Sequence, residues 1–198
     1  MAGNISHPNT FSNNLLHNLG ALQGTKPYIR VGGNTQDYAI YDPTLPVATT
    51  GTFTPTVSTD YPLQLGIGKS YFESYSTWAD TKFIHGFNLA ANTTEDRELL
   101  LDTVPLACQA LEGGKLAYWE FGNEPDLYKT SAQGIKRPAT WTEQDYVDEW
   151  LNGTRAMKQV LEEACPNEVT AEAYKYYAPS FAGTNNNNFT MRSALLEG

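Results

Sequence analysis

The chain has 198 residues, of which 40% are hydrophobic and 12% aromatic, as expected for a globular protein with one buried core. Its formal net charge of -9 and isoelectric point near 4.7 argue against binding to nucleic acid or to an anionic membrane, because both need clustered Lys and Arg. No apolar run reaches the roughly 18 residues of a transmembrane helix, so no membrane partner is expected.

The first elements expected along the chain are a helix and a short strand. Apolar residues recur at helical spacing over residues 11–22 and predict a helix. Residues 28–31, YIRV, predict a strand that ends at Gly32 and Gly33. This strand therefore leads directly into the polar residues 34–37, NTQD.

A long polar segment separates this strand from the next buried one. Residues 41–61 are rich in Pro, Thr and Gly, which favours a long loop or a small hairpin. A short strand over residues 63–66 and a helix over residues 71–79 are expected to follow. Residues 82–88, KFIHGFN, then have the apolar character of a buried strand.

The middle of the chain predicts a helix followed by a strand. Thr94 is a candidate N-cap, with acidic residues in the first turn where they suit the helix dipole. Pro105 is expected to kink this helix, and Gly113 and Gly114 are expected to end it. Residues 115–121, KLAYWEF, predict the next strand.

The last third of the chain continues the alternation of helices and strands. Thr142 and Asp145 have the spacing of a capping box and predict a long helix that ends before Pro166. Residues 168–176 predict another strand, and residues 191–198 the opening of a helix. Strands that alternate with helices predict βαβ units and a parallel sheet, so the expected fold class is α/β.

The strand expected over residues 115–121 delivers Asn123, Glu124 and Pro125 at its carboxyl end, where parallel α/β barrels carry their catalytic side chains. A Glu there can protonate the leaving oxygen of a glycosidic bond, while a second carboxylate about 5 to 5.5 Å away attacks the anomeric carbon in a retaining enzyme. Asn123 can hydrogen-bond a sugar hydroxyl. In the structural interpretation, Glu124 caps the following loop and Asn123 makes a turn; the triplet alone does not decide.

Two stretches carry a resemblance to a known family. YWEFGNEPDLY, residues 118–128, and YIRVGGNTQDYAIYDP, residues 28–43, resemble glycoside hydrolase family 79 of clan A, in its fungal-type β-glucuronidase branch related to heparanase. The two stretches match that family in order and spacing, and residues 8–22 fit the same pattern. The resemblance implies a retaining hydrolase that acts on β-glucuronides of glycans or glycoconjugates. No cofactor is expected, and the isolated histidines indicate no metal site.

The resemblance also implies roles for individual residues. Glu124 corresponds to the general acid/base, and Asn123 is expected to contact the 2-hydroxyl of the sugar. Asn34, Gln36 and Asp37 are expected to line the substrate pocket, because they follow the strand that corresponds to the second strand of the family's barrel.

For the fold, the resemblance implies a partial TIM (β/α)8 barrel, roughly strands 2 to 5 with their helices, with the first strand and the last strands absent. A complete barrel takes about 250 residues, so residues 1–198 are expected to form an incomplete catalytic domain, a fragment that lacks the nucleophile. Glu120 and Glu172 are poor substitutes for that nucleophile. Glu120 is instead expected to pair with Arg30 inside the barrel.

Two other functions remain open. The first is another clan A β-glycosidase, for example a β-glucosidase, which would lack a clamp for the glucuronate carboxylate. The second is a non-catalytic sugar-binding remnant, which would bind a carbohydrate without turning it over.

The sequence also bears on the compartment in which the protein works. Residues 1–16 lack the basic start and apolar core of a signal peptide. Extracellular localisation is nevertheless expected for the full-length protein, because four N-x-[ST] sequons offer sites for N-glycans, although chance can produce such tripeptides. The four sequons begin at Asn4, Asn92, Asn152 and Asn188.

The cysteines and histidines give little indication of function. Cys108 and Cys165 can either bridge neighbouring helices or remain two buried free thiols, and the sequence leaves both alternatives open. His7, His17 and His85 are isolated and lack metal-ligand spacing, so each is expected to be an ordinary core or surface histidine.

Overall fold

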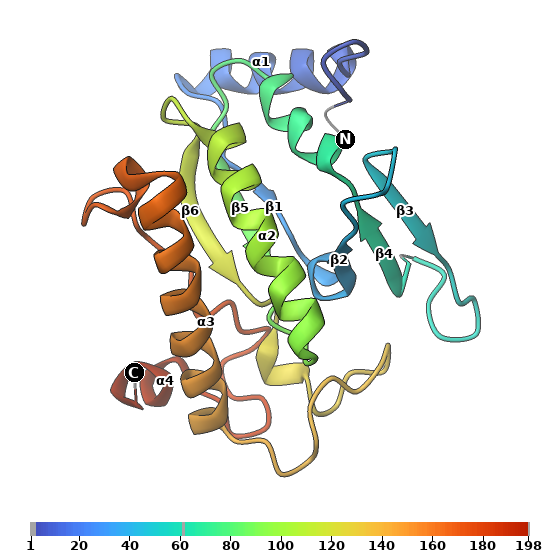
Figure 1. Ribbon diagram of the computed structural model, residues 1–198, viewed down its shortest axis with the longest axis vertical. Coiled ribbons are helices and arrows are strands. Elements are labelled where there is room, and N and C mark those ends of the chain that lie inside the picture. Colours follow the sequence, from blue (N-terminus) through green and yellow to red (C-terminus); the bar gives the residue numbers. More distant parts are fainter. Residues whose placement is uncertain (1–2, 61, 198) are drawn as a thin grey trace.

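A three-stranded parallel sheet lies at the centre of the molecule in a computed structural model that describes residues 3–60 and 62–197 (Figure 1). The strand order is β1 (Ile29–Val31), β5 (Phe83–Phe87) and β6 (Leu116–Phe121), and both pairings are parallel. A single parallel bridge from Trp119 to Tyr176 extends the sheet beyond β6. The α/β class with a parallel sheet is therefore confirmed.

A second, smaller sheet is formed by the segment between β1 and β5. It consists of β2 (Ala39–Tyr41), β4 (Gln64–Ile67) and β3 (Thr49–Thr52), in that order. β4 pairs parallel to β2 and antiparallel to β3. The expected small hairpin and the expected short strand over residues 63–66 thus belong to one side structure rather than to the central sheet.

Helices α2 (Thr94–Leu111) and α3 (Glu143–Ala164) lie side by side on one face of the central sheet (Figure 1). Their N-caps are Thr93 and Thr142, and the capping box of Thr142 with Asp145 is confirmed. The cap expected at Thr94 is wrong by one residue, because the Thr93 side chain accepts the hydrogen bond from the Asp96 amide. The remaining α-helices are α1 (Thr10–Gln23) and α4 (Met191–Glu197).

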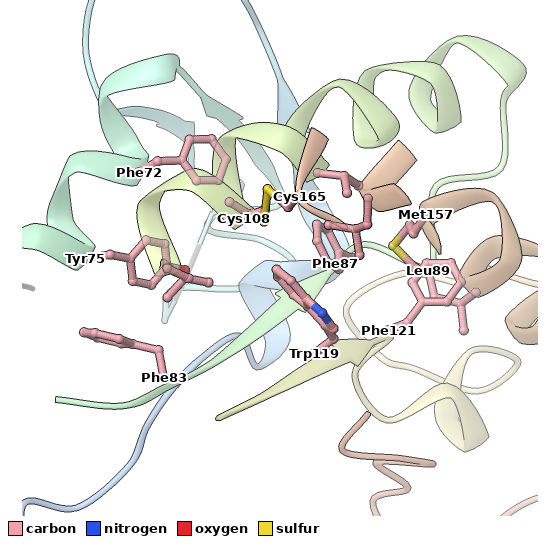
Figure 2. Close-up of a cluster of buried hydrophobic side chains, with 14 of the residues drawn as sticks. Phe72, Tyr75, Phe83, Phe87, Leu89, Cys108, Trp119, Phe121, Met157 and Cys165 are labelled. Carbon is pink, nitrogen blue, oxygen red and sulfur yellow. A yellow bond between two sulfur atoms is a disulfide. The ribbon is translucent and has the colours of Figure 1, made fainter. Parts of the chain in front are cut away.

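The core forms where α2 and α3 cover the strands. Alternate residues of β5 are buried, namely Phe83, His85 and Phe87. Phe83 and Phe87 lie in the core together with Trp119 and Phe121 of β6 (Figure 2). Burial lowers the pKa of His85 to about 3, so this histidine is a neutral core residue, as its isolation in the sequence suggested.

The strand expected over residues 168–176 is wrong. Pro166 instead begins the 3-10 helix η4 (Pro166–Val169), and the amides of Ala173 and Tyr174 then bond back to the Thr170 carbonyl in a turn. Such a turn satisfies the hydrogen bonds of these backbone groups locally, so Tyr176 is the one residue of the segment 168–176 that pairs with β6. Glu172 is exposed in this turn rather than part of a strand.

Within residues 3–60 and 62–197, three further 3-10 helices carry short connections: η1 (Asn34–Tyr38), η2 (Lys69–Ser76) and η3 (Pro125–Leu127). η2 replaces the longer helix expected over residues 71–79. Among the described residues, no helix combines the length and the apolar character needed to cross a membrane.

The apolar stripe predicted for the first helix does form, but it faces outward. α1 lies near the end of the sheet at which the strands begin (Figure 1), and Leu16 is its only buried residue. The stripe itself is solvent-exposed, and consists of Phe11, Leu15, Leu19 and Leu22. Exposed apolar stripes of this kind commonly mark a surface that packs against further structure.

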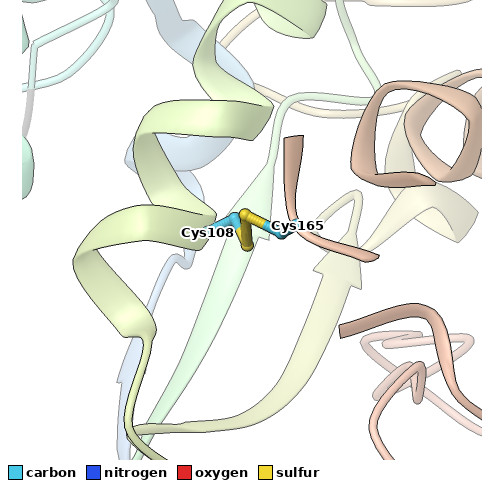
Figure 3. Close-up of a disulfide and its surroundings, with 2 residues drawn as sticks. All are labelled: Cys108 and Cys165. Atoms are coloured by element: carbon cyan, nitrogen blue, oxygen red, sulfur yellow. A yellow bond between two sulfur atoms is a disulfide. The ribbon is translucent and has the colours of Figure 1, made fainter. Parts of the chain in front are cut away.

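The two cysteines form a disulfide that joins the two core helices (Figure 3). Cys108 lies in α2 and Cys165 directly follows α3, with 6.6 Å between their Cα atoms. Both are buried in the core, near Phe72 and Phe87 (Figure 2). Of the two alternatives that the sequence left open, the bridge between neighbouring helices is therefore the one observed.

Candidate active site

Glu124 lies in a constrained turn at the carboxyl end of β6. Gly122 has a φ of 93°, and a Cβ atom there would lie 2.8 Å from the side chain of buried Leu89, so the position requires glycine. Glu124 has φ 50° and ψ 49°, the left-handed region that non-glycine residues rarely occupy. Strained backbone at one residue of a strand end is typical of functional sites.

The surroundings of Glu124 hold its backbone while leaving its side chain free. The Glu124 amide donates to the Ser180 carbonyl at 3.0 Å, and its carbonyl accepts from the Leu127 amide at 2.9 Å. The side chain is partly exposed, and within residues 3–60 and 62–197 it has no hydrogen-bonded side-chain partner. The carboxylate is therefore available to a bound molecule.

Arg30 and Glu120 form the ion pair that the sequence predicted. Arg30 Nε lies 2.8 Å from Glu120 Oε2, and Arg30 Nη2 lies 2.8 Å from Glu120 Oε1, so the contact is bidentate. Both side chains lie on the face of the sheet away from the core, and they reach each other across Gly86 of β5, the residue that pairs with Glu120. Partial burial opposes the charge of Arg30, but the hydrogen bonds and charge of Glu120 outweigh this effect and raise the pKa of Arg30.

Asn123 connects this ion pair to the polar turn after β1. Its side-chain oxygen, Oδ1, accepts a hydrogen bond from Arg30 Nη2 at 2.9 Å, and its side-chain nitrogen, Nδ2, donates to Asn34 Oδ1 at 3.1 Å. Asn34 itself is exposed. The ends of β1 and β6 thus bring Arg30, Asn34, Asn123 and Glu124 into one polar cluster.

The other two residues expected to line the pocket are buried, as is Asn123 at 5% exposure. Gln36 is 5% exposed and donates from Nε2 to the Phe87 carbonyl at 2.8 Å, with its side chain lying over Gly86 where a Cβ atom would collide with it. Asp37 is 8% exposed, and its Oδ1 atom accepts from the Tyr128 hydroxyl at 2.8 Å. Burial raises the pKa of Asp37 to about 7. Contact of either side chain with a substrate stays a prediction.

A loop from the end of the chain supports the site, and sequence reasoning missed it. Ser180 Oγ donates to Glu120 Oε1 at 2.6 Å. Asp126 is fully buried and accepts hydrogen bonds from the Ala182 amide, at 2.9 Å, and from Asn186 Nδ2, at 2.8 Å. No pattern in the sequence signals these contacts, because they join segments more than 50 residues apart through irregular backbone.

A cavity of about 1110 Å³ reaches the cluster from the side of β1, and Arg30 and Gln36 are among its lining residues. It extends between β1, η2 and the second sheet, where Ile29, Tyr71 and Phe83 also line it. Neither Asn123 nor Glu124 lines it. We therefore define the candidate site by the side chains that meet at the strand ends. In the described part of the chain, no three His, Cys, Asp or Glu side chains cluster in a way that could hold a metal ion.

Replacement of Arg30 by glutamine is expected to destabilise the protein by about 2 kcal/mol. The change removes the charged partner of Glu120, which is 0% exposed and would keep only the Ser180 hydroxyl. Loss of one partner of a fully buried pair costs about 3 to 5 kcal/mol, but Arg30 is 38% exposed and water can replace part of its contact. Urea unfolding measures the difference. Arg155→Gln, on the exposed surface of α3, is the control, and an equal effect of both substitutions would contradict the prediction.

Fold and site together define a mixed α/β protein with an Asn-Glu pair at the carboxyl end of a parallel strand. The chain is 69% identical over 185 residues to a β-glucuronidase from Aspergillus niger, and 59% identical over 187 residues to a β-glucuronidase from Neurospora crassa. Each match covers 93% of this chain and 34% of the relative, so the chain spans about a third of the length of these curated relatives. No protein-family model matches the chain.

Among solved structures, the chain is similar to a 4-O-α-L-rhamnosyl-β-D-glucuronidase from Fusarium oxysporum, whose crystal structure is a complex with Rha-GlcA. The TM-score is 0.60 at 24% sequence identity, and the match covers 86% of this chain and 33% of that chain. At this level of identity, the likeness supports the mixed α/β arrangement alone.

Proposed function

We propose that this chain forms part of the catalytic domain of a retaining hydrolase of β-glucuronides, with Glu124 as its general acid/base. The observation that carries the proposal is the position of Glu124. It has a strained backbone and a free carboxylate, and it lies at the carboxyl end of a parallel strand beside Asn123 and Arg30. The identity of 69% to a β-glucuronidase supports the substrate class.

In this function, each residue of the cluster has a definite task. Glu124 protonates the glycosidic oxygen as the bond to the leaving group breaks, and then removes a proton from the water that releases the sugar. Asn123, held by Arg30 and Asn34, donates to the 2-hydroxyl of the sugar. The nucleophile is a carboxylate supplied by residues outside the 198 of this chain.

The fold of this domain is, in our proposal, part of a (β/α)8 barrel of clan A and family 79 type, and residues 1–198 contribute roughly strands 2 to 5. Three features support this. The strand order β1-β5-β6, followed by Tyr176, is the order of consecutive strands in such a barrel. Among the described strands, none pairs with the outer edge of β1. The exposed apolar stripe of α1 offers a surface on which further barrel elements can pack.

We also propose that the protein is secreted and carries N-glycans. The disulfide between Cys108 and Cys165 is typical of proteins that fold in an oxidising compartment. All four sequon asparagines have exposed side chains, as a glycan requires; they are Asn4, Asn92, Asn152 and Asn188. Treatment of the secreted protein with an N-glycosidase, followed by mass spectrometry, identifies the modified positions.

The test of the function uses the native protein that carries this sequence and two substrates with the same leaving group. We expect kcat/KM for 4-nitrophenyl β-D-glucuronide to exceed that for the β-D-glucoside by about a hundredfold or more, because a pocket built for a charged group rejects an analogue that lacks it. Anomeric NMR signals of the first product should show retained configuration. Preference for the glucoside would favour another β-glycosidase, and binding without turnover would favour a sugar-binding remnant.

A further inference from the structure

One carboxylate accepts hydrogen bonds from residues on both sides of Glu124. Asp37, in η1, accepts at Oδ1 a hydrogen bond from the Tyr128 hydroxyl at 2.8 Å and a longer one from the Asn123 amide at 3.4 Å. Asn123 precedes Glu124, and Tyr128 follows the short helix η3. The two donors therefore mark the ends of the segment 123–128, which we name the acid/base turn.

We propose that Asp37 is a positioning residue that holds the acid/base turn by both of its ends and so directs the Glu124 carboxylate, a role that rests on the proposed function of Glu124. Asp37 is buried at 8% exposure, and all of the hydrogen bonds described for its carboxylate go to this turn. Because both of these hydrogen bonds go to the turn, the proposed role of Asp37 acts through Glu124.

The acid/base turn needs such a support because its backbone is strained. Glu124 has positive φ, and η3 spans only Pro125–Leu127, so few hydrogen bonds within the turn maintain its shape. On one side, two contacts hold the turn. The Ser180 carbonyl accepts a hydrogen bond from the Glu124 amide, and the Ala182 amide donates a hydrogen bond to the Asp126 carboxylate. Asp37 provides the support from the side of β1.

The charged groups around Asp37 make its contact with the turn sensitive to pH near neutrality. Burial raises the pKa of Asp37 to about 7, and the charge of Glu120 at the end of β6 acts in the same direction. Lys136 and the hydrogen bonds from Tyr128 and Asn123 act in the opposite direction. Because the pKa lies above its ordinary value, Asp37 becomes fully ionised, and the stronger acceptor for both donors, only as the pH rises through about 7.

The first test measures catalysis by Asp37→Asn in the native protein that carries this sequence. A misplaced general acid affects substrates whose leaving group needs a proton. We therefore expect kcat/KM to fall about tenfold or more for methyl β-D-glucuronide, and by less than about threefold for the 2,4-dinitrophenyl glucuronide. Tyr128→Phe removes one of the two hydrogen-bond donors to Asp37. It should change kcat/KM for the two substrates in the same direction as Asp37→Asn, but by a smaller factor. Asp42→Asn is the matched control, because the Asp42 carboxylate bonds to neighbouring Thr44.

The positioning role would be overturned if Asp37→Asn lowered kcat/KM equally for both substrates, or if its kcat/KM values matched those of Asp42→Asn. A second measurement does not depend on activity. In the 198-residue chain, the amide NMR signals of Asn123 and Glu124 should titrate with a midpoint near 7, in line with the pKa of Asp37, and this titration should vanish in Asp37→Asn but persist in Asp42→Asn. Its persistence in Asp37→Asn would overturn the proposal. If the unmodified protein hydrolyses neither glucuronide, the function of Glu124 fails, while the titration still decides whether Asp37 holds the turn.

Discussion

Replacement of Glu124 by glutamine is expected to lower kcat/KM for β-glucuronides with poor leaving groups by about a hundredfold or more, the usual scale for the loss of a general acid. Glutamine preserves the shape of the side chain but has no proton to donate at neutral pH. The fold should persist, because the hydrogen bonds at this position are made by the Glu124 backbone to Ser180 and Leu127. Steady-state kinetics with methyl β-D-glucuronide, together with a thermal melt, measures both parts of the prediction.

Two comparisons make this result specific to the acid/base role. The 2,4-dinitrophenyl glucuronide needs little protonation of its leaving group, so its first bond-breaking step should be slowed far less than that of the methyl glucuronide. Glu172 is exposed in the turn after η4, so Glu172→Gln should leave kcat/KM unchanged for both substrates. If the native protein is active and Glu124→Gln hydrolyses the methyl glucuronide at the unmodified rate, Glu124 is not the acid/base.

Local sequence pattern was sufficient to predict the elements that build the central sheet. β5 and β6 are short apolar runs bounded by Gly, Asn or Asp, and α3 carries a capping box at its start, so each boundary depends on residues close in sequence. The pairing of Glu120 with Arg30 was also predictable. A charged residue inside an apolar strand must find a partner, and Arg30 is the basic residue of the same sheet, two strands away across β5.

The strand expected over residues 168–176 failed for a reason that lies outside the segment. Tyr174 and Tyr176 have the aromatic character of a strand, but Tyr174 uses its hydroxyl to bond the Thr154 carbonyl on α3. The backbone around it closes a turn at Thr170. Strand propensity describes how a residue packs, and here packing against the helix competes with pairing in the sheet.

The supports of the candidate site were unpredictable for a related reason. Asp37 is expected to line the pocket because it follows a strand end, and the structure adds a hydrogen bond from the Tyr128 hydroxyl that the sequence did not indicate. That contact spans 91 residues of sequence and depends on how η1 folds against the acid/base turn. Residue type and spacing indicated which segments meet at the site, whereas the hydrogen bonds that join these segments required three-dimensional positions.

Loss of the disulfide between Cys108 and Cys165 is expected to lower the free energy of unfolding by about 4 kcal/mol. The bridge closes a loop with a sequence separation of 57 residues, and this loop contains β6, the acid/base turn and α3. A crosslink of this length restricts the unfolded chain, so its loss favours unfolding even when the folded contacts persist. Guanidinium unfolding of the 198-residue chain, with and without reducing agent, measures the effect.

A double replacement, Cys108→Ala with Cys165→Ala, separates the crosslink from the reducing agent. The variant should have about the same denaturation midpoint as the reduced chain, lowered slightly further because two buried sulfur atoms are removed. Reducing agent should not change the midpoint of this variant. An unchanged denaturation midpoint on full reduction of the unmodified chain would contradict the prediction.

The disulfide should also affect the candidate site. The bridge ties α2 to the end of α3, so its loss should loosen the packing of the two helices that cover β6. Hydrogen exchange at the amide of Glu124, which follows that strand, should then be faster.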